Sequence, residues 1–577
     1  MSNSRPDHLT WRHWTLGLLV LASVVAVMVR LYQVQILNHD DYLEQAAVSR
    51  QGAATLPAPR GAILDATGYP LATSVDTWDI YIDRFLWRDD EQALTAARGL
   101  ADFMGMSPDV LYATGTEEDR GDVLVTRQMD YATGLDLEAM DLWGVRLIPS
   151  SRRIYPEGDL AGQLVGYVGR DGHGLWGIES DFDPTLEGRP GWTTTERDAL
   201  GRPIAFSQQR VKEPVSGGEV QLTIDRFMQQ MAEETLAAAL LEYEARSGSI
   251  IVMDPYTGAI LAMASQPSVS LAAVDLNDPG LDALVKNAAV TDLYEPGSVL
   301  KTLTTAAALD LGLVTPESSF EDSGAVEVGG YTIRNWDLQA HGLTSVRGYL
   351  QASLNTGSVW LAEMIGADQF YDYIGDFGLG TPTHVGLSGE AEGTYRTPAD
   401  PDWYEVDLAT NSYGQGLAAT PLQILTAVNS FANGGLLMRP YIVSKVVTRS
   451  DVRTYEPVTV RRVVSERTAG TMLDLMHDVV EGTEWHGARV PGYNVAGKTG
   501  TTLVSIPTGY DIDSTIASFA GFIPYEDPRV SVLVKIDQPS GGLNLGGQVA
   551  APVFSDLAAQ LMDYLRVPPN RNVVAAP

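Results

Sequence analysis

The chain has 577 residues, of which 45% are hydrophobic and 19% charged, a composition typical of a folded protein with room for several domains. Its formal net charge of -34 argues against nucleic-acid binding, because contact with phosphates needs clusters of Lys and Arg. Cysteine is absent, which excludes disulfides, thiolate catalysis and Cys-ligated zinc, and no spacing of His and Glu indicates another metal site. We therefore expect neither a metal nor a cofactor.

The first feature along the chain is an apolar run from Trp14 to Val29, which basic residues precede and acidic residues follow. With the mixed stretch after it, the run approaches the roughly 20 residues that a membrane-spanning helix needs. No small-residue cleavage site follows closely, so we expect an uncleaved single-pass anchor over 14–37 rather than a signal peptide. The positive-inside rule then predicts that residues 1–13 lie in the cytoplasm and the rest outside it.

A mixed module is expected between the anchor and residue 211. Residues 38–56 have a helical pattern, and beyond them short strands, acidic helices and many Gly and Pro turns follow one another without internal repeats. We interpret 38–211 as an α+β domain.

The pattern becomes stronger after Gly218 and predicts a second domain over 212–566, followed by a tail over 567–577. Two apolar strands at 249–254 and 259–264 are joined by a turn sequence and predict a hairpin. We expect further strands at 220–224, 514–522 and 529–537, and helices at 226–243, 300–311, 346–354, 357–365, 419–433, 465–481 and 552–565. This order favours an α+β fold with a central antiparallel sheet covered by helices on both faces.

A candidate nucleophile and base stand at the start of the helix expected at 300–311. After the turn Glu295-Pro296-Gly297, Ser298 and Lys301 lie one helical turn apart, where backbone N–H groups favour developing negative charge. An ordinary helix with a capping Ser and a solvated Lys is the alternative. However, the chain has only six lysines, and Ser298 is the only Ser three residues before one. The Ala-rich surroundings would also bury Lys301, where an amine must be paired or neutral.

Two later segments complete a candidate site. Ser353-Leu354-Asn355 follows an expected helix, where Ser and Asn are usually caps, and Lys498-Thr499-Gly500-Thr501 lies on an expected strand. Gly500 would let a substrate backbone approach that strand closely. In this order, the three segments resemble the signature set of penicillin-binding proteins and serine β-lactamases. The middle motif, Ser-Leu-Asn, is similar to the Ser-any-Asn pattern of penicillin-binding transpeptidases and counts against a class A β-lactamase.

The resemblance extends from about Arg30 to Phe554 and is closest to class B, monofunctional penicillin-binding proteins. Segments that look like the family's amino-terminal pedestal, or dimerisation-type domain, are Arg60-Gly61-Ala62-Ile63-Leu64-Asp65, Gly68, Leu71-Ala72, Arg152-Arg153-Ile154-Tyr155-Pro156, Gly177-Ile178-Glu179 and Leu186-Glu187-Gly188. Segments similar to its transpeptidase domain are Asp254-Pro255-Tyr256-Thr257-Gly258, Tyr413-Gly414-Gln415-Gly416, Thr420-Pro421-Leu422-Gln423 and Ala432-Asn433-Gly434-Gly435. The chain departs from the pattern at Asn287-Ala288-Ala289, usually Asn-Arg-Ala, and at Ala352, usually Ser. Neither departure changes a group that does chemistry.

The resemblance implies a membrane-anchored peptidoglycan D,D-transpeptidase that β-lactams inhibit covalently. Ser298 would attack the D-Ala-D-Ala bond of a stem peptide, Lys301 would take its proton, and an amine of a neighbouring stem would resolve the acyl-enzyme. Ser353 would relay a proton, and Asn355 would orient the substrate amide. Thr499 and Thr501 would bind the terminal carboxylate, with Lys498 supplying positive potential. The backbone N–H groups of Ser298 and Thr501 would form the oxyanion hole.

Other functions stay open at this point. A D,D-carboxypeptidase or a β-lactam sensor performs the same acylation, and a non-catalytic scaffold could activate a lipid II polymerase through the anchor and pedestal. The compact pedestal and the segment 158–169 look more like the division or sporulation type than the elongation type. The resemblance implies the bacterial cytoplasmic membrane as location. It also implies a polymerase of the shape, elongation, division and sporulation (SEDS) family and other divisome or elongasome proteins as partners.

Overall fold

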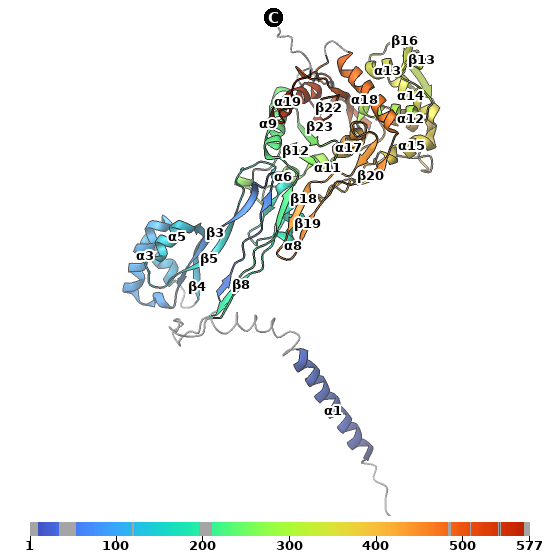
Figure 1. The fold of residues 1–577 in the computed structure, drawn as a ribbon. Helices are drawn as coiled ribbons and strands as arrows, with labels where there is room; N and C mark the ends of the chain where they lie inside the picture. The colour runs from blue at the N-terminus through green and yellow to red at the C-terminus, as the bar shows by residue number, and fades with distance from the viewer. Residues whose placement is uncertain are drawn as a thin grey trace, which may run out of the picture. The chain divides into compact units, whose positions relative to one another are not determined.

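A computed structural model describes residues 10–33, 54–117, 121–194, 210–482, 486–507, 509–540, 542 and 544–570 (Figure 1). The first helix, α1 (Thr10–Tyr32), contains the stretch Trp14–Tyr32 of 19 residues and mean hydropathy 2.1, long and apolar enough to cross a membrane by length and composition. At 1.5 Å per residue it covers roughly 28 Å, close to the thickness of a hydrocarbon core. Residues 34–37 of the expected anchor and 38–53 of the expected helix lie outside the described residues. The end of that expected helix is wrong, because Ala54–Leu56 forms a strand that pairs with Gly191–Thr193.

The chain divides into two compact units that interleave along the sequence. The first unit contains Met1–Pro59, Val75–Arg152 and Gly188–Gly217, and the second contains Arg60–Ser74, Arg153–Glu187 and Gly218–Pro577. Two strands, β3 (Pro70–Asp83) and β5 (Val145–Ile154), each contribute residues to both units. The sequence pattern does not indicate this interleaving.

The first unit combines helices with antiparallel strands, as expected for an α+β module. Its helices are α3 (Asp90–Met104), α4 (Pro108–Thr116) and α5 (Tyr131–Glu138), and β4 (Asp122–Asp130) pairs with the later half of β3. The core includes Ile80, Ile82, Trp87 and Leu100. A second sheet has the order β1 (Ala54–Leu56), β8 (Gly191–Thr194) and β9 (Arg210–Lys212).

The second unit is built on a five-stranded antiparallel sheet of order β12-β11-β23-β22-β21. These strands are β11 (Ser247–Met253), β12 (Ile260–Gln266), β21 (Ala496–Ile506), β22 (Gly509–Ile523) and β23 (Val530–Asp537). The expected antiparallel sheet and the hairpin at its start are therefore confirmed.

Helices cover both faces of this sheet. Successive residues of β11 point to opposite faces, and they belong to two different hydrophobic cores. Ile250 and Val252 belong to a core shared with α9 (Arg226–Glu242) and α19 (Ala550–Tyr564). Ile251 and Met253 belong to the core on the other face. That core includes residues of α12 (Lys301–Asp310), α13 (Val346–Ala352), α14 (Asn355–Ile365), α17 (Pro421–Ala432) and α18 (Glu466–Glu481).

The expected strand at 220–224 is confirmed as β10 (Glu219–Leu222). Several other short strands around the helices were not expected from the sequence. They are β13 (Ser319–Asp322), β14 (Ala325–Val328), β15 (Tyr331–Arg334), β16 (Gly342–Ser345), β18 (Val443–Val447), β19 (Val452–Thr454) and β20 (Thr459–Arg462). Several of them carry polar and exposed side chains, so they lack the apolar alternation that identifies a half-buried strand.

A buried ion cluster lies in the part of the second unit formed by residues 60–74 and 153–187. Glu179 is fully buried, and its two carboxylate oxygens lie 2.6 Å from Nε of Arg60 and 2.6 Å from Nε of Arg153. Arg60 also donates to the Glu179 carbonyl and Arg153 to the Gly61 carbonyl. The three charged residues come from segments far apart in sequence, so this cluster fixes how those segments meet.

Candidate functional site

The turn that carries Ser298 is packed tightly between two other segments. Ser298 lies in a short 3-10 turn, Gly297–Val299, and α12 begins at Lys301, so the expected i, i+3 spacing holds although the first turn is not α-helical. Gly297 has a φ of +55° and donates its N–H to the Gly414 carbonyl at 3.0 Å. A Cβ on Gly297 would lie 2.7 Å from the carbonyl oxygen of Thr501. Only glycine fits here, and it sets the Ser298 turn directly against β21.

The hydroxyl of Ser353 lies between two buried lysines. The Lys301 Nζ is 3.3 Å and the Lys498 Nζ 3.0 Å from Ser353 Oγ. Lys301 Nζ is also 2.9 Å from Asn355 Oδ1 and donates to the Ser353 carbonyl. The structure thus brings together four of the residues singled out in the sequence. Among the described residues the Ser298 hydroxyl makes no hydrogen bond, so it is not linked to Lys301 here.

Both amines are in surroundings that disfavour a positive charge. Lys301 is fully buried, and burial together with the charge of Lys498 lowers the pKa of Lys301 well below its usual range. Burial lowers the pKa of Lys498 to about 7. Within the described part of the chain, no carboxylate forms an ion pair with either lysine. A neutral amine at Lys301 can accept a proton, as a general base must.

The middle motif is held in place from two sides. Ser353 ends α13 with a φ of +56°, a left-handed conformation that a non-glycine residue adopts at a cost and that is frequent at functional sites. Asn355 begins α14, and its Nδ2 donates to the Arg334 carbonyl at 2.9 Å. A buried network of Asp322, Asn335 and Thr356 anchors the start of the same helix.

The Lys498 segment lies on β21, the edge strand of the five-stranded sheet. Lys498 and Gly500 share one face of the strand, and Thr499 and Thr501 share the other. A Cβ on Gly500 would lie 2.4 Å from the Pro296 carbonyl oxygen and 2.4 Å from Ser518 Oγ. Glycine is therefore required for packing against the nucleophile's turn, a reason separate from the substrate approach predicted above. The Thr501 hydroxyl accepts a hydrogen bond from Gly546 N at 2.9 Å.

Residues that support the site were not found from the sequence. The Arg334 carbonyl and the Asp322–Asn335–Thr356 network lie on or beside the short polar strands that were missed, and Gly546 lies in a loop before α19. Polar residues in such segments have no periodic pattern by which they could be recognised as part of the site. Of the supporting segments, only Tyr413-Gly414-Gln415-Gly416 was singled out, because it resembles a segment of the family.

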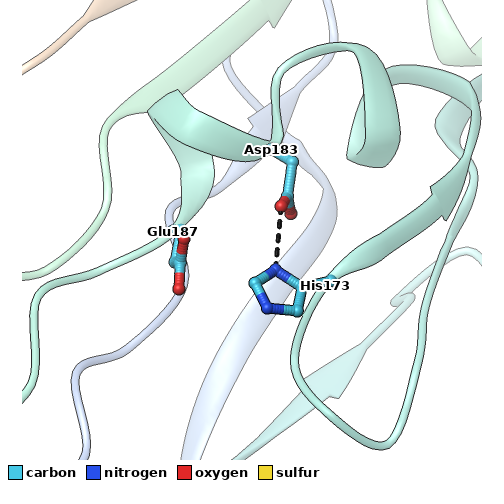
Figure 2. Close-up of side chains that lie close together, drawn as sticks. All are labelled: His173, Asp183 and Glu187. Atoms are coloured by element: carbon cyan, nitrogen blue, oxygen red, sulfur yellow. Dashed lines mark hydrogen bonds and ion pairs between the residues drawn. The ribbon is translucent and has the colours of Figure 1, made fainter.

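One group of potential metal ligands lies outside this site (Figure 2). The ligand atoms of His173, Asp183 and Glu187 lie within 4.8 Å of one another. Asp183 is already engaged: one oxygen lies 3.0 Å from His173 Nδ1, and the other accepts from Gly174 N and lies 2.7 Å from Arg60 Nη1. A guanidinium on the same carboxylate opposes a cation there. Asp183 is thus joined through Arg60 to the buried Arg60–Glu179–Arg153 cluster.

Comparison with family models identifies two regions of the chain. Residues 248–559 match the penicillin binding protein transpeptidase domain, and residues 55–222 match the penicillin-binding protein dimerisation domain.

Known proteins are similar over nearly the whole chain. Stage V sporulation protein D of Bacillus subtilis is 31% identical, over 99% of this chain and 88% of the relative. The peptidoglycan D,D-transpeptidase FtsI of Escherichia coli is 29% identical, over 98% of this chain and 94% of the relative. The crystal structure of penicillin binding protein 3 of Mycobacterium tuberculosis complexed with aztreonam has a TM-score of 0.69 and 27% identity, covering 90% of this chain and 99% of that one.

Proposed function

The chain belongs to the penicillin-binding protein transpeptidase family, and we propose that it is a peptidoglycan D,D-transpeptidase that works through a Ser298 acyl-enzyme. The observation that carries the proposal is the arrangement around Ser353 Oγ, which lies 3.3 and 3.0 Å from two buried amines that have no carboxylate partner among the described residues. Such a group can take up and release protons near neutral pH.

The proposed reaction has two halves. Ser298 Oγ attacks the carbonyl carbon of the D-Ala-D-Ala bond while Lys301 Nζ takes the hydroxyl proton. The negative charge on the carbonyl oxygen is stabilised by the N–H groups of Ser298 and Thr501, a proposal that the close approach of Gly297 to Thr501 supports. The C–N bond then breaks, and D-Ala leaves after its nitrogen receives the proton by way of Ser353.

In the second half, the amine of another stem peptide attacks the ester carbonyl and passes a proton by way of Ser353 to Lys301. The C–O bond then breaks, and Ser298 Oγ leaves and takes that proton back from Lys301. Asn355 orients the substrate amide. Before D-Ala leaves, Thr499 and Thr501 bind the terminal carboxylate of the donor beside the positive potential of Lys498, and Gly500 lets the substrate backbone approach the strand. In the structure the Thr501 hydroxyl accepts from Gly546 N, which leaves its own proton for a carboxylate.

Labelling with a fluorescent penicillin tests the acyl-enzyme. We expect the full-length protein to take up one label per chain, with the penicilloyl mass on the peptide that contains Ser298. Ser298→Ala should abolish labelling while leaving the melting temperature within a few degrees, because it removes only one half-buried oxygen. A folded wild-type protein that takes up no label would overturn the proposed function.

We further propose the surroundings in which the enzyme works. The apolar helix α1 supports a single-pass anchor, and the charge pattern around it supports a cytoplasmic amino terminus and an extracytoplasmic enzyme in the bacterial cytoplasmic membrane. Similarity to proteins of sporulation and division supports a role in division rather than elongation, with a SEDS-family polymerase and divisome proteins as partners. The boundaries at 38–211 and 212–566 stay predictions about the functional division of the chain.

A further inference from the structure

Glu295, three residues before the nucleophile, has a carboxylate whose contacts the proposed reaction does not use. Its Oε1 accepts from Gly416 N at 3.0 Å and from the Tyr510 hydroxyl at 2.9 Å, and its Oε2 accepts from the Thr502 hydroxyl at 3.3 Å. The three donors come from three separate segments: the loop after α16 (Glu405–Asn411), the strand β21 and the tip of β22. Each of these segments borders the Ser298 turn or continues the strand that carries Lys498.

The neighbouring backbone makes one of these connections as well. Tyr294 exchanges two backbone hydrogen bonds with Ala419, at 3.0 Å each, and Gly297 N donates to the Gly414 carbonyl at 3.0 Å. These three bonds join residues 294–297 to the loop at 414–419. The Glu295 side chain adds hydrogen bonds to β21 and β22, beside the packing of Gly297 on Thr501.

Using a carboxylate to join these segments costs free energy, because the group is partly removed from water. Within the described residues no Lys, Arg or His forms an ion pair with Glu295, and burial raises the pKa of its carboxyl group. A partly buried charge without a cation destabilises a fold, so stability alone does not explain its presence. Two oxygens that accept three hydrogen bonds can, however, define the distance between three segments.

We propose that Glu295 is a positioning residue that fixes the Ser298 turn relative to the Lys498 strand and the tip of the β21–β22 hairpin. The inference rests on the proposed function. Without the carboxylate, the Ser298 turn and the strand bearing Thr501 keep their backbone packing but lose the side-chain restraint beside it. Small displacements of a nucleophile from its oxyanion donors reduce the rate of reaction without greatly changing ground-state binding.

Acylation kinetics separate positioning from general stability. In rapid-mixing experiments with a fluorescent penicillin, we expect Glu295→Ala to lower the first-order acylation constant about tenfold to a hundredfold with a dissociation constant within about twofold of wild type. Glu295→Gln should stay within about threefold of wild type, because its carbonyl oxygen can accept from Gly416 and Tyr510 and its amide can donate to Thr502. Tyr510→Phe, which removes one donor, should give an intermediate rate.

Glu233 on α9 provides a matched control. It is also a partly buried carboxylate whose pKa burial raises, and its Oε1 accepts from Ala161 N and Gln229 Nε2 at 2.8 Å each. Glu233→Ala should lower the melting temperature but leave the acylation constant unchanged. The inference is wrong if Glu295→Ala acylates at the wild-type rate, or if Glu295→Gln is as slow as Glu295→Ala.

Two controls keep these outcomes distinct from failure of the proposed function. If Glu295→Ala does not fold, the rate of Tyr510→Phe decides, and a wild-type rate contradicts the inference. If the wild-type protein itself is not labelled, the proposed function is overturned and the inference with it. Normal wild-type labelling with an unaffected Glu295→Ala overturns the inference alone.

Discussion

At the scale of single residues, the proposed chemistry depends on keeping one of two neighbouring amines neutral. Lys301 and Lys498 both lie against Ser353 Oγ, and burial lowers the pKa of each. In the folded protein these groups bind protons less tightly than in the unfolded chain. The stability associated with them is therefore present at high pH and lost as the pH falls toward the lowered pKa values. The reaction rate should change with pH in the same direction, because only the neutral amine can act as the base.

The acylation rate should therefore rise with pH, and Lys498 should set where the rise occurs. Since the charge of Lys498 lowers the pKa of Lys301, Lys498→Met should move the midpoint of the pH–rate profile to higher pH. Its rate deficit against wild type should be larger at about pH 6 than at about pH 9. Stopped-flow acylation by a fluorescent penicillin measures both profiles.

Lys445 on β18 is the control lysine for this experiment, because its charge is not among the causes of the lowered pKa of Lys301. Lys445→Met should leave the midpoint unchanged. An unchanged midpoint in Lys498→Met as well would mean that Lys498 does not control the protonation of Lys301.

The sequence predicted the groups of the proposed reaction but not the groups that hold them. Ser298, Lys301, Ser353 and Lys498 stand in short motifs with fixed spacing, so they could be singled out without a structure. The hydrogen bonds of Glu295 and the approach of Gly546 to Thr501 join residues 45 to 215 positions apart. Contacts over such separations depend on the complete fold and leave no local pattern.

At the scale of elements, close approach of the nucleophile's turn to β21 is the feature that builds the site. Gly297 and Gly500 face each other's backbones, with a Cβ at either position falling 2.4–2.7 Å from a carbonyl oxygen of the other segment. The long periodic helices and apolar strands were predicted well because their patterns extend over many residues. The contact between the Gly297 turn and β21 was not predicted in detail, because a local sequence pattern does not show which element packs on which.

Substitution of Gly500 should therefore lower stability and acylation more than substitution of a surface glycine does. Gly500→Ala places a methyl group 2.4 Å from both the Pro296 carbonyl oxygen and Ser518 Oγ, so β21 must move away from the Ser298 turn. We expect the melting temperature to fall by several degrees and the acylation rate to fall at least about tenfold. Differential scanning fluorimetry and penicillin labelling measure the two effects.

Gly470 on α18 is the control, since a Cβ there would meet nothing within 4 Å. Gly470→Ala should leave acylation unchanged and stabilise the protein by up to about 1 kcal/mol, because the position is an exposed one within a helix. Wild-type acylation by a folded Gly500→Ala variant would show that the close approach is not needed for reactivity.

At the scale of the whole molecule, segments quoted as separate family motifs prove to be parts of one assembly. Arg60, Arg153 and Glu179 stand in three different motifs and meet in a single buried ion cluster of the second unit. The composition of each segment indicated a Pro- and Gly-rich α+β module and nothing more. Interleaving of the two units arises because β3 pairs with β2 (Ile63–Leu64) near its start and with β4 toward its end. Such pairing is a property of the folded chain.

Orientation in the membrane can be tested in the full chain because it contains no cysteine. Single-cysteine variants Ser2→Cys and Gly470→Cys place one thiol on each side of the proposed anchor, the second at an exposed position. If residues 1–13 are cytoplasmic, a membrane-impermeant maleimide should modify Gly470→Cys in spheroplasts and Ser2→Cys only after lysis. Equal penicillin labelling of both variants checks that each is folded. Modification of Ser2→Cys in intact spheroplasts, with Gly470→Cys protected, would reverse the orientation and place the enzyme where it has no access to the wall.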